Sequence, residues 1–315
     1  MNARLNVLLA LMLLFPACRS DETAPRITVL SIKWKLVSSS FDLPDAIEVW
    51  EGTDENLPLK AWMAKIDLSS SDVRVEVLSS NDEDGQQSTS DFAKEFGACL
   101  VVNGGYFRKV DESFRPIGLL LSGGDLVHAA TPGIFRGDIR YDVHRAAIGF
   151  DKSNRAEIGW VSSRGDSVFL WQDPIDNMPE LPGLMLSIDS SSVWEVTNAL
   201  SGGPALLKDG SNRITVNEEV FFGSSILDIH PRTAAGIGEN GELFILVVDG
   251  RQGASRGVSL TELAAIMRAF GVRDALNLDG GGSSTLVVRN ELLNSPEGSR
   301  FQREVVSAIA IHCAE

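Results

Sequence analysis

The chain has 315 residues, of which 43% are apolar and 23% charged, a composition typical of a globular protein. Its formal net charge of −15 argues against general nucleic-acid binding, because that needs a basic face to displace counterions from phosphates. An anionic substrate would require a local basic pocket, so the arginines are the residues to follow. No linker divides the chain after its first residues, and we expect one domain over residues 26–315.

The first 25 residues predict a secretory signal followed by a short polar tether. Arg4 precedes an apolar run over residues 7–15 that is too short to span a membrane. Residues 15–18, Phe-Pro-Ala-Cys, resemble the lipobox of bacterial lipoproteins, in which the cysteine is lipidated and becomes the new N-terminus. An ordinary cleaved signal peptide is the alternative. Under both interpretations we expect the body of the protein to be extracytoplasmic. The lipobox resemblance implies a bacterial protein, which lipidation of Cys18 would anchor to a membrane.

Strand patterns dominate the chain, and many end at Gly, Asn, Asp or Ser turns. They include residues 46–50, 59–68, 73–78, 99–103 and 117–121. Residues 146–161 and 234–248 predict antiparallel hairpins, which turn at 152–154 and 239–241. Helical periodicity is rare: a short helix is expected over residues 90–96, and residues 181–196 are ambiguous. The fold class is therefore α+β, with strand-rich mixed sheets, many antiparallel hairpins and few helices.

Two cysteines remain beyond the first 25 residues. Cys99 and Cys313 each lie in an apolar run that predicts a strand. An oxidising compartment permits a disulfide between them. We favour two buried thiols that act as small hydrophobic side chains, and neither has a nearby histidine that would indicate use as a nucleophile.

The clearest helix is predicted over residues 259–271. Ser259 and Glu262 have the spacing of a capping box, and Gly271 supplies the end of the helix. Strand patterns on both sides indicate a C-terminal βαβ unit, whose connection is almost always right-handed and whose two strands run parallel.

Each strand of this unit ends at an aspartate followed by glycine. Residues 243–251 end in Asp249, Gly and Arg251, and residues 275–284 continue from Asp279 into three glycines and two serines. Parallel strands end at the same edge of a sheet, so we expect both aspartates to face one crevice. Their separation would be about 5 Å for neighbouring strands and about 10 Å with one strand between.

The three consecutive glycines at residues 280–282 would let an anion approach the main chain. Gly280, Gly281 and the next glycine leave backbone N–H groups able to form an anion-binding concavity, and Ser283 and Ser284 would add hydroxyl donors. A glycine-rich hairpin between residues 277–279 and 284–289 is the alternative. The phosphate-binding pattern GxxxxGK[ST] and the nucleophile pattern GxSxG are not found in this run.

Three further motifs carry polar residues beside strands. VVNGGYF at residues 101–107 places Asn103 and Gly104 before Tyr106 and an adjacent phenylalanine, which can stack on a sugar ring. LSGGPALLKDG at residues 200–210 has a similar composition. HPRTAAG at residues 230–236 places a histidine, Arg232 and Thr233 just before the hairpin that leads to the first aspartate.

The motifs VVNGGYF, SGGPALLKDG, HPRTAAGIGENGELFILVVDGR, TELAAIM and ALNLDGGGSSTLVV, in that order, resemble the phosphodiester glycosidase family. The similarity covers roughly Cys99 to the C-terminus, whereas residues 27–98 carry little of it. The resemblance implies hydrolysis of a sugar-1-phosphodiester, of the N-acetylglucosamine-1-phosphodiester type, to a free sugar and a phosphomonoester. Surface or exopolysaccharide metabolism is the expected setting. The implied active-site residues are Asn103, Arg232, Asp249, Arg251, Asp279, Gly280, Ser283 and Ser284.

Within that reaction we assign Arg232 and Arg251 to the phosphate, through charge-assisted hydrogen bonds and with help from the glycine-loop amides. Asp249 and Asp279 would serve the anomeric centre, one of them as base or nucleophile. The other expected contacts to a sugar-phosphate or polysaccharide substrate come from Gly104, Tyr106, Thr233 and Gly281.

Two alternatives remain open. The first is a metal-assisted phosphodiesterase, although none of His128, His144, His230 and His312 lies at ligand spacing to another, so no metal site or cofactor is assigned. Calcium or magnesium held by Asp279 and loop oxygens stays open. The second is a non-catalytic lipoprotein that binds surface polysaccharide. No nucleic-acid partner is expected, and the oligomeric state is not indicated.

Overall fold

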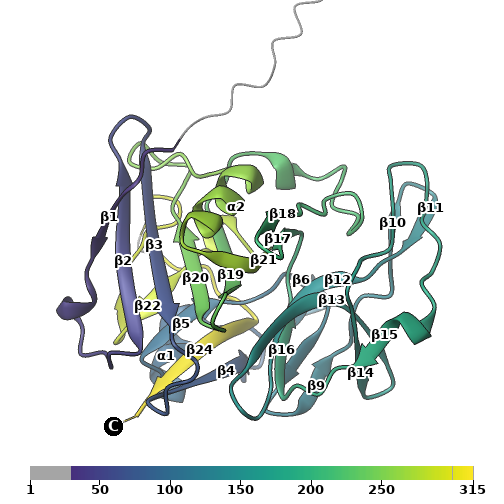
Figure 1. The fold of residues 1–315 in the computed structure, drawn as a ribbon, viewed down its shortest axis with the longest axis horizontal. Helices are drawn as coiled ribbons and strands as arrows, with labels where there is room; N and C mark the ends of the chain where they lie inside the picture. The colour runs from purple at the N-terminus through teal and green to yellow at the C-terminus, as the bar shows by residue number, and fades with distance from the viewer. Residues whose placement is uncertain (1–29, 300, 315) are drawn as a thin grey trace, which may run out of the picture.

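The computed structural model describes residues 30–299 and 301–314. The predicted signal, the tether to residue 25 and the lipidation site at Cys18 lie outside these residues. Figure 1 shows strands β1, β2 and β3 at one end of the molecule and the β10–β11 hairpin at the other. Three larger sheets and two short hairpins make up the strand content.

The eight-stranded sheet joins segments from both ends of the chain. Its strands, in spatial order, are β1 (Lys33–Leu36), β2 (Ile47–Asp54), β3 (Leu59–Ile66), β20 (Leu243–Val248), β19 (Arg232–Gly238), β21 (Val272–Asn277), β17 (Ala205–Lys208) and β18 (Ser211–Asn212). Strand β3 pairs with β20, so the N-terminal part of the chain, which carries little of the family resemblance, completes the sheet that carries the late motifs.

The second sheet has seven strands and the third has five. The seven-stranded sheet contains β15 (Ser191–Val193), β14 (Ser167–Trp171), β13 (Ala156–Arg164), β12 (Arg145–Phe150), β16 (Asn198–Ser201), β8 (Leu120–Ser122) and β9 (Asp125–His128). The five-stranded sheet contains β23 (Glu291–Leu292), β22 (Leu286–Val288), β5 (Leu100–Asn103), β24 (Ser307–Cys313) and β4 (Val73–Ser79). The two isolated hairpins are β6 (Phe107–Val110) with β7 (Ser113–Pro116), and β10 (Gly133–Arg136) with β11 (Ile139–Asp142).

The predicted strand-rich α+β class with many antiparallel hairpins and few helices is confirmed. The hairpins β12–β13 and β19–β20 turn where the sequence indicates. Every pairing between described strands is antiparallel. The sheets are therefore antiparallel, whereas the sequence predicted mixed sheets. The reason is that β19 lies between β20 and β21 and pairs antiparallel with both. The two strands of the βαβ-like unit are therefore parallel to each other without being neighbours.

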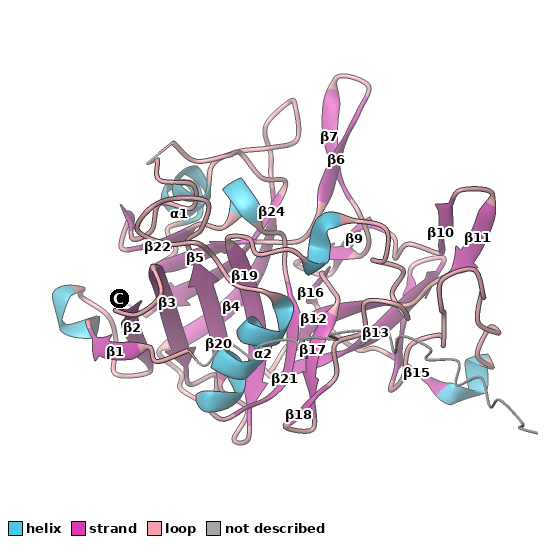
Figure 2. Ribbon diagram, turned by 90° about the horizontal axis from the view of Figure 1, so that it is seen from above, coloured by secondary structure: helices cyan, strands magenta, loops and turns pink. Residues whose placement is uncertain are grey.

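Helix α2 (Leu260–Ala269) connects these two strands. Ser259 caps its N-terminus in a capping box with Glu262, and Gly271 follows its end in the left-handed region, as predicted. Helix α1 (Thr89–Phe96) is capped by Ser88 and ends at a left-handed Gly97. Figure 2 shows α2 lying against the eight-stranded sheet. No helix among the described residues is long and apolar enough to cross a membrane.

The principal hydrophobic core is shared by the three larger sheets. Ile245 of β20, Ile148 of β12 and Ile309 of β24 are fully buried in this one cluster. A second cluster lies under α2, where Leu263 and Met267 pack against the opposite face of the eight-stranded sheet. Burying one such side chain stabilises the fold by about 1.5–3 kcal/mol. The shared core holds the strand ends that carry the candidate site.

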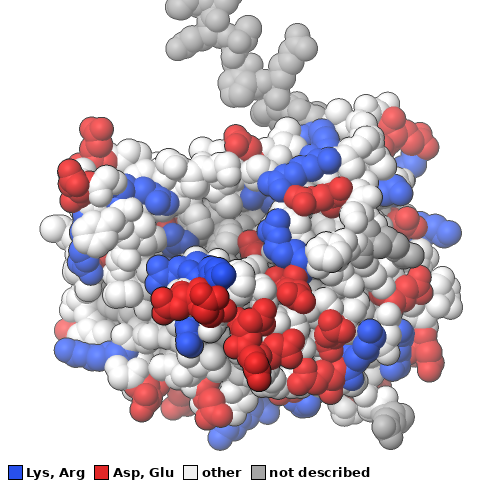
Figure 3. Space-filling view, turned by 180° about the vertical axis from the view of Figure 1, so that it is seen from behind, with Lys and Arg blue, Asp and Glu red and all other residues white. Residues whose placement is uncertain are grey.

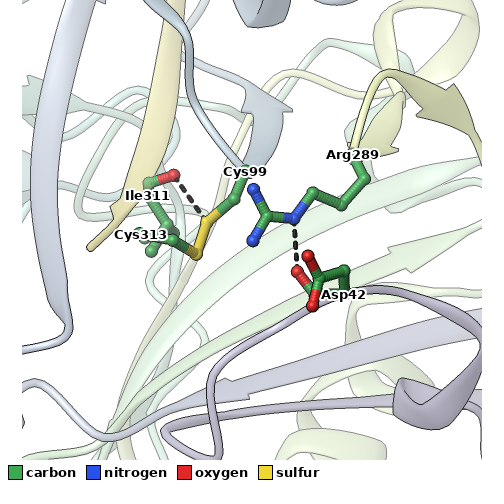
Figure 4. The surroundings of a disulfide bond; sticks show 5 residues. All are labelled: Asp42, Cys99, Arg289, Ile311 and Cys313. Carbon is green, nitrogen blue, oxygen red and sulfur yellow. Dashed lines mark hydrogen bonds between the residues drawn. A yellow bond between two sulfur atoms is a disulfide. The ribbon is translucent and has the colours of Figure 1, made fainter. Parts of the chain in front are cut away.

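Cys99 and Cys313 form a disulfide, so the preferred interpretation of two buried thiols was wrong (Figure 4). The residues are 214 positions apart, with Cα atoms separated by 5.8 Å. Cys99 directly precedes β5 and Cys313 ends β24, and these two strands are antiparallel neighbours. The pairing of the two strands, which the apolar patterns do not specify, brings the sulfur atoms together.

Candidate active site

A cavity of about 490 Å³ lies at the strand ends where the late motifs meet. Asp279 is the carboxylate among its lining residues, together with the arginines Arg136, Arg145, Arg232, Arg251 and Arg303. Such a concentration of arginines is the local basic pocket that an anionic ligand would need in a protein of net charge −15. Figure 3 shows one face of the molecule, on which Lys and Arg side chains lie around a recess and acidic side chains gather below it.

Asp279 lies two residues after the end of β21 and reaches the cavity as predicted. Burial raises the pKa of its carboxyl to about 6, against hydrogen bonds from Ser283 and Gly280 and the positive charge of Arg303. The Gly280 amide donates to Oδ1 at 2.9 Å. A carboxyl group with a pKa near 6 is mostly ionised at neutral pH, yet basic enough to accept a proton during a reaction.

Asp249 does not lie at this cavity, and the expectation that the two aspartates face one crevice was wrong. Its side chain is 2% exposed, and its Oδ1 accepts hydrogen bonds from Asn294 Nδ2 at 2.8 Å and from the Ser295 amide at 3.1 Å. Burial raises the pKa of Asp249, and these hydrogen bonds oppose the rise. The carboxylate thus fastens the segment after β23 to the end of β20.

Arg232 is the first residue of β19 and lines the cavity, although only 2% of it is exposed. Its guanidinium donates to the carbonyl oxygens of Ile226, Asp228 and Val258 at 2.6, 2.7 and 3.2 Å. Each hydrogen bond that it makes to the described part of the chain therefore goes to a neutral group. These bonds orient the guanidinium and leave its charge available to an anion.

Arg251 also lines the cavity, where its backbone adopts a left-handed φ of 55°. Its guanidinium pairs with the Glu297 carboxylate and contacts His230 Nδ1 at 3.0 Å. His230 Nε2 lies 2.8 Å from the carbonyl oxygen of Ser225. A carbonyl can only accept, so Nε2 carries the proton and Nδ1 accepts from Arg251. A neutral histidine and a carboxylate thus fix the direction of Arg251.

The glycine turn differs from both alternatives considered for it. Strands β21 and β22 on its two sides belong to different sheets, so it is not the tip of a hairpin. The amides of Gly281, Ser283 and Ser284 donate to the carbonyls of Pro231, Gly280 and Gly281. Gly281 thus donates to a residue outside the turn, whereas Ser283 and Ser284 donate within a single turn of 3-10 helix, η4 (Gly281–Ser283), so these three amides are not open to an anion as predicted.

Close approach explains the glycines of this turn. A Cβ atom on Gly280 would lie 2.9 Å from the Pro231 carbonyl oxygen. Gly281 has a left-handed φ of 62°, and a Cβ there would lie 3.3 Å from Arg251 Nη1. Both glycines line the cavity, where the main chain passes between Asp279 and Arg251. Ser283 and Ser284 are fully buried and do not line it. The Ser283 hydroxyl bonds to the Asp279 carboxylate, and Ser284 Oγ has no hydrogen-bond partner among the described residues.

Asn103 and Thr233 are fully buried and do not line the cavity either, contrary to expectation. Asn103 Nδ2 donates to the backbone oxygen of Asp279 at 2.8 Å, and its Oδ1 accepts from Thr233 Oγ1 at 2.8 Å and the Thr285 amide at 3.2 Å. The backbone oxygen of Gly104 accepts from the Asp279 amide at 3.2 Å. The VVNGGYF motif therefore holds the main chain that carries Asp279.

Tyr106 lines the cavity as predicted. Its hydroxyl donates to the Gly203 carbonyl at 2.8 Å and accepts from Asn277 Nδ2 at 2.7 Å. Burial raises the pKa of this hydroxyl above its usual value, so the hydroxyl keeps its proton. The ring of Phe221 lies beside it, with 5.8 Å between centroids. The two rings form an apolar wall next to the arginines.

The sequence motifs did not single out several lining residues, among them Arg136, Arg145, Phe221 and Arg303. Arg145 had a usable signal, because it stands at the start of a predicted hairpin, as Arg232 does. The other three lie in segments without periodic patterns. Among residues 30–299 and 301–314, no group of three or more His, Cys, Asp or Glu side chains is placed to hold a metal ion.

A basic cavity with aromatic walls and one carboxylate of elevated pKa is the kind of site that binds an anionic ligand containing a ring. The family model for phosphodiester glycosidases matches residues 96–312. The chain therefore belongs to the phosphodiester glycosidase family.

Individual relatives agree with this family. The chain is 27% identical over 226 residues to bovine N-acetylglucosamine-1-phosphodiester alpha-N-acetylglucosaminidase, covering 70% of this chain and 38% of that protein. It spans about two fifths of the length of the curated bovine and mouse relatives that it matches.

Two solved structures share the fold. The catalytic domain of the zebrafish enzyme of the same name, auto-inhibited by its pro-peptide, matches with a TM-score of 0.57 and 23% identity over 90% of this chain and 89% of that one. A hypothetical protein from Synechocystis matches with a TM-score of 0.59 and 17% identity, over 90% and 68% of the two chains.

Proposed function

We propose that this protein hydrolyses sugar-1-phosphodiesters to a free sugar and a phosphomonoester. The observation that carries the proposal is the position of Asp279, a carboxyl group with a pKa of about 6, in a cavity lined by five arginines. Membership of the phosphodiester glycosidase family supports the reaction type. The names of the bovine and mouse relatives support N-acetylglucosamine as the sugar.

Arg232 and Arg251 bind the phosphodiester in this proposal. Both are held by the protein before substrate arrives, Arg232 by three carbonyls and Arg251 by Glu297 and His230. Prearranged donors stabilise the charge that develops on the departing phosphate without a cost of reorganisation during the reaction. A phosphate ester is a good leaving group, so strong general-acid help is not required.

Asp279 acts at the anomeric carbon in its ionised form, as general base toward water or as nucleophile. The rings of Tyr106 and Phe221 provide a surface on which the sugar can pack. Asp249, to which we first gave a share of this chemistry, has no place in the mechanism because its carboxylate is bound to Asn294 and Ser295. One carboxylate in the cavity thus replaces the expected pair.

The direct test is a screen of the purified protein on three substrates: an α-linked N-acetylglucosamine-1-phosphodiester, the matching aryl glycoside without phosphate, and a simple phosphodiester without sugar. We expect turnover of the first alone, and its loss in Asp279→Asn. Turnover of the simple phosphodiester would favour a phosphodiesterase. Repeating the assay with a chelator tests the calcium or magnesium alternative, and no turnover of any of the three would favour a binding module.

We also propose an extracytoplasmic lipoprotein that acts in surface or exopolysaccharide metabolism. The signal pattern with Cys18 supports this location, and so does the Cys99–Cys313 disulfide, since disulfides persist in oxidising compartments. Fractionation of cells that express the full-length chain or its Cys18→Ala variant tests it. The unchanged chain should partition with membranes and the variant should lack the lipid anchor; equal release of both would contradict it.

A further inference from the structure

The cavity has a second pair of arginines that the proposed reaction does not use. Arg136 is the last residue of β10, and Arg145 is the first residue of β12. Both line the same cavity as Arg232 and Arg251. They come from the middle of the chain, whereas the residues assigned to the scissile phosphodiester come from the ends of β19 and β20. The pocket is therefore basic on elements of three different sheets.

The position of Arg145 matches that of Arg232 in a second hairpin. Residues 145–149 read RAAIG and residues 232–236 read RTAAG, a shared Arg-x-Ala-x-Gly pattern. Each arginine begins the first strand of an antiparallel hairpin, β12–β13 or β19–β20. Each is more than nine-tenths buried and still lines the cavity. Two sheets therefore present an equivalent arginine to one space.

The contacts of Arg145 leave part of its guanidinium without a partner. Its Cζ lies 3.7 Å from the centroid of the Phe221 ring, and its buried Nε has no hydrogen-bond partner among the described residues. Glu219 is the carboxylate whose charge acts on Arg145. The oxygens of Glu219 are already engaged, with the amides of Ala146 and Ala205 at 2.9 and 2.8 Å and with the Trp160 indole at 3.1 Å.

Arg136 is held in a similar way on the neighbouring hairpin. Its Nη2 donates to the Val220 carbonyl at 2.8 Å, and its buried Nε has no partner among the described residues. Val220 is fully buried and has a φ of 57°, an unusual left-handed conformation for a β-branched residue. Strained backbone of this kind is retained mainly where the surroundings fix it, often at binding sites.

The arginines exceed what one phosphodiester requires. A phosphodiester carries one negative charge, and Arg232 and Arg251 already face it in the proposed mechanism. Burial and then the positive charge of Arg136 lower the pKa of Arg145, against the effects of Glu219 and Tyr106, so the two guanidinium groups lie close enough to repel each other. The Nε atoms of both guanidinium groups are buried without a partner among the described residues, and buried donors of this kind are costly unless an acceptor reaches them.

We propose that Arg136 and Arg145 form a second anion subsite, which binds a phosphate or carboxylate group of the substrate separate from the scissile phosphodiester. The inference rests on the proposed function and narrows its substrate class to sugar-1-phosphodiesters that carry a further negative charge. The cavity of about 490 Å³ is within the range of pockets that hold ligands of this size.

Three substrates that differ only in the alcohol test the subsite: N-acetylglucosamine-1-phosphodiesters of glycerol, of glycerol phosphate and of glyceric acid. We expect kcat/KM for at least one of the two substrates with an additional anionic group to exceed that of the glycerol compound by about tenfold or more, as charge-assisted hydrogen bonds predict. Which of the two is preferred identifies phosphate or carboxylate as the group bound. In Arg145→Gln and Arg136→Gln this ratio should fall to about one or two.

Arg140→Gln is the matched control, because Arg140 lies on the same β10–β11 hairpin, is exposed and pairs with Asp142. It should retain the wild-type ratio, which separates a subsite from a general effect of net charge. If Arg145→Gln does not fold, Arg136→Gln and the charge-retaining Arg145→Lys decide the question. A wild-type ratio near one, or an equal loss on all three substrates in both glutamine variants, would overturn the proposal.

A binding measurement separates failure of the subsite from failure of the proposed function. Calorimetric titration compares glycerol 1,3-bisphosphate with glycerol 1-phosphate, neither of which contains a sugar. Tighter binding of the bisphosphate, lost in Arg136→Gln and Arg145→Gln, would support the subsite even if no sugar-1-phosphodiester is turned over. Turnover of all three substrates at equal efficiency, with equal binding of the two phosphates, would refute the subsite and leave the proposed function standing.

Discussion

Asp249 and Asp279 occupy matching positions in the chain and differ in almost every contact. Each follows the end of a strand, each precedes a glycine, and the strands β20 and β21 run parallel with β19 between them. Asp249 is 2% exposed and bound to Asn294 and Ser295, whereas Asp279 lines a cavity with arginines. Position at a strand end therefore does not by itself make a carboxylate catalytic.

The difference lies in what the neighbouring chain offers each carboxylate. The segment after β23 supplies the buried Asp249 carboxylate with a side-chain amide and a backbone amide. Asp279 receives the Gly280 amide and faces Arg303. Its main chain is held from behind by Asn103, which leaves the side chain free to face the cavity. Asp249 is thus bonded within the protein, whereas Asp279 lines the cavity in which we propose that it acts.

The largest effect is expected from Asp279→Asn. The change keeps the size of the side chain and removes its basicity, so kcat/KM on a sugar-1-phosphodiester should fall by about 10²-fold or more. Circular dichroism and thermal unfolding should show a folded protein. Asp274→Asn on β21, which removes a partner of Lys208 outside the cavity, is the control and should retain activity. Near-normal turnover in folded Asp279→Asn would show that Asp279 has no catalytic role and serves only in the turn.

Arg232→Lys tests the arginine at the start of β19, the strand that lies between β20 and β21 in the sheet. Lysine keeps the charge but loses the planar group that reaches three carbonyls and a phosphate together, so we expect about a 10- to 100-fold loss in kcat/KM. Arg273→Lys, an exposed position on β21 paired with Asp209, is the matched control. Full activity in Arg232→Lys would move the phosphate away from this arginine.

The pH dependence of kcat/KM should show an acidic limb that belongs to Asp279. Its pKa is raised to about 6 and its ionised form is the active one, so activity should rise with pH, reach half its maximum near pH 6 and level above about pH 7. At one pH unit below 6, the rate should be about tenfold lower. A profile that stays flat between pH 4.5 and 7 would argue that another group, or the carboxylic acid form, carries the reaction.

Asp249→Asn should have the smallest effect on turnover and a measurable effect on stability. It disturbs a buried carboxylate that accepts from two amides, so the free energy of unfolding in urea should fall by about 1–3 kcal/mol. The kcat of the folded variant should stay within about threefold of the unchanged protein. A loss comparable to that of Asp279→Asn, without loss of stability, would restore Asp249 to the active site.

Much of the local structure could be predicted because its signals are local. The capping box at Ser259 and the turns of the two hairpins depend on residues a few positions apart, and they form as expected. Asp279 and Arg232 reach the cavity as the motifs indicate. For these features, residue type and spacing already specify the geometry.

The remaining features depend on partners that are distant in sequence. The Asn103 side chain bonds to Asp279 and Thr233, so a motif that suggests substrate contact serves to hold the turn. Arg136 and Arg303 carry no pattern that distinguishes them from surface arginines. The Cys99–Cys313 disulfide follows from the pairing of β5 with β24, which apolar runs alone do not determine.

Hydrolysis in ¹⁸O-labelled water tests the central claim most directly, because it reports which bond breaks. With Asp279 acting at the anomeric carbon and Arg232 and Arg251 holding the leaving phosphate, water attacks carbon. Mass spectrometry should then find the label on the C1 hydroxyl of the released sugar and none in the phosphomonoester. Label in the phosphomonoester would show attack at phosphorus and contradict the assignment of Asp279 and of the arginines together.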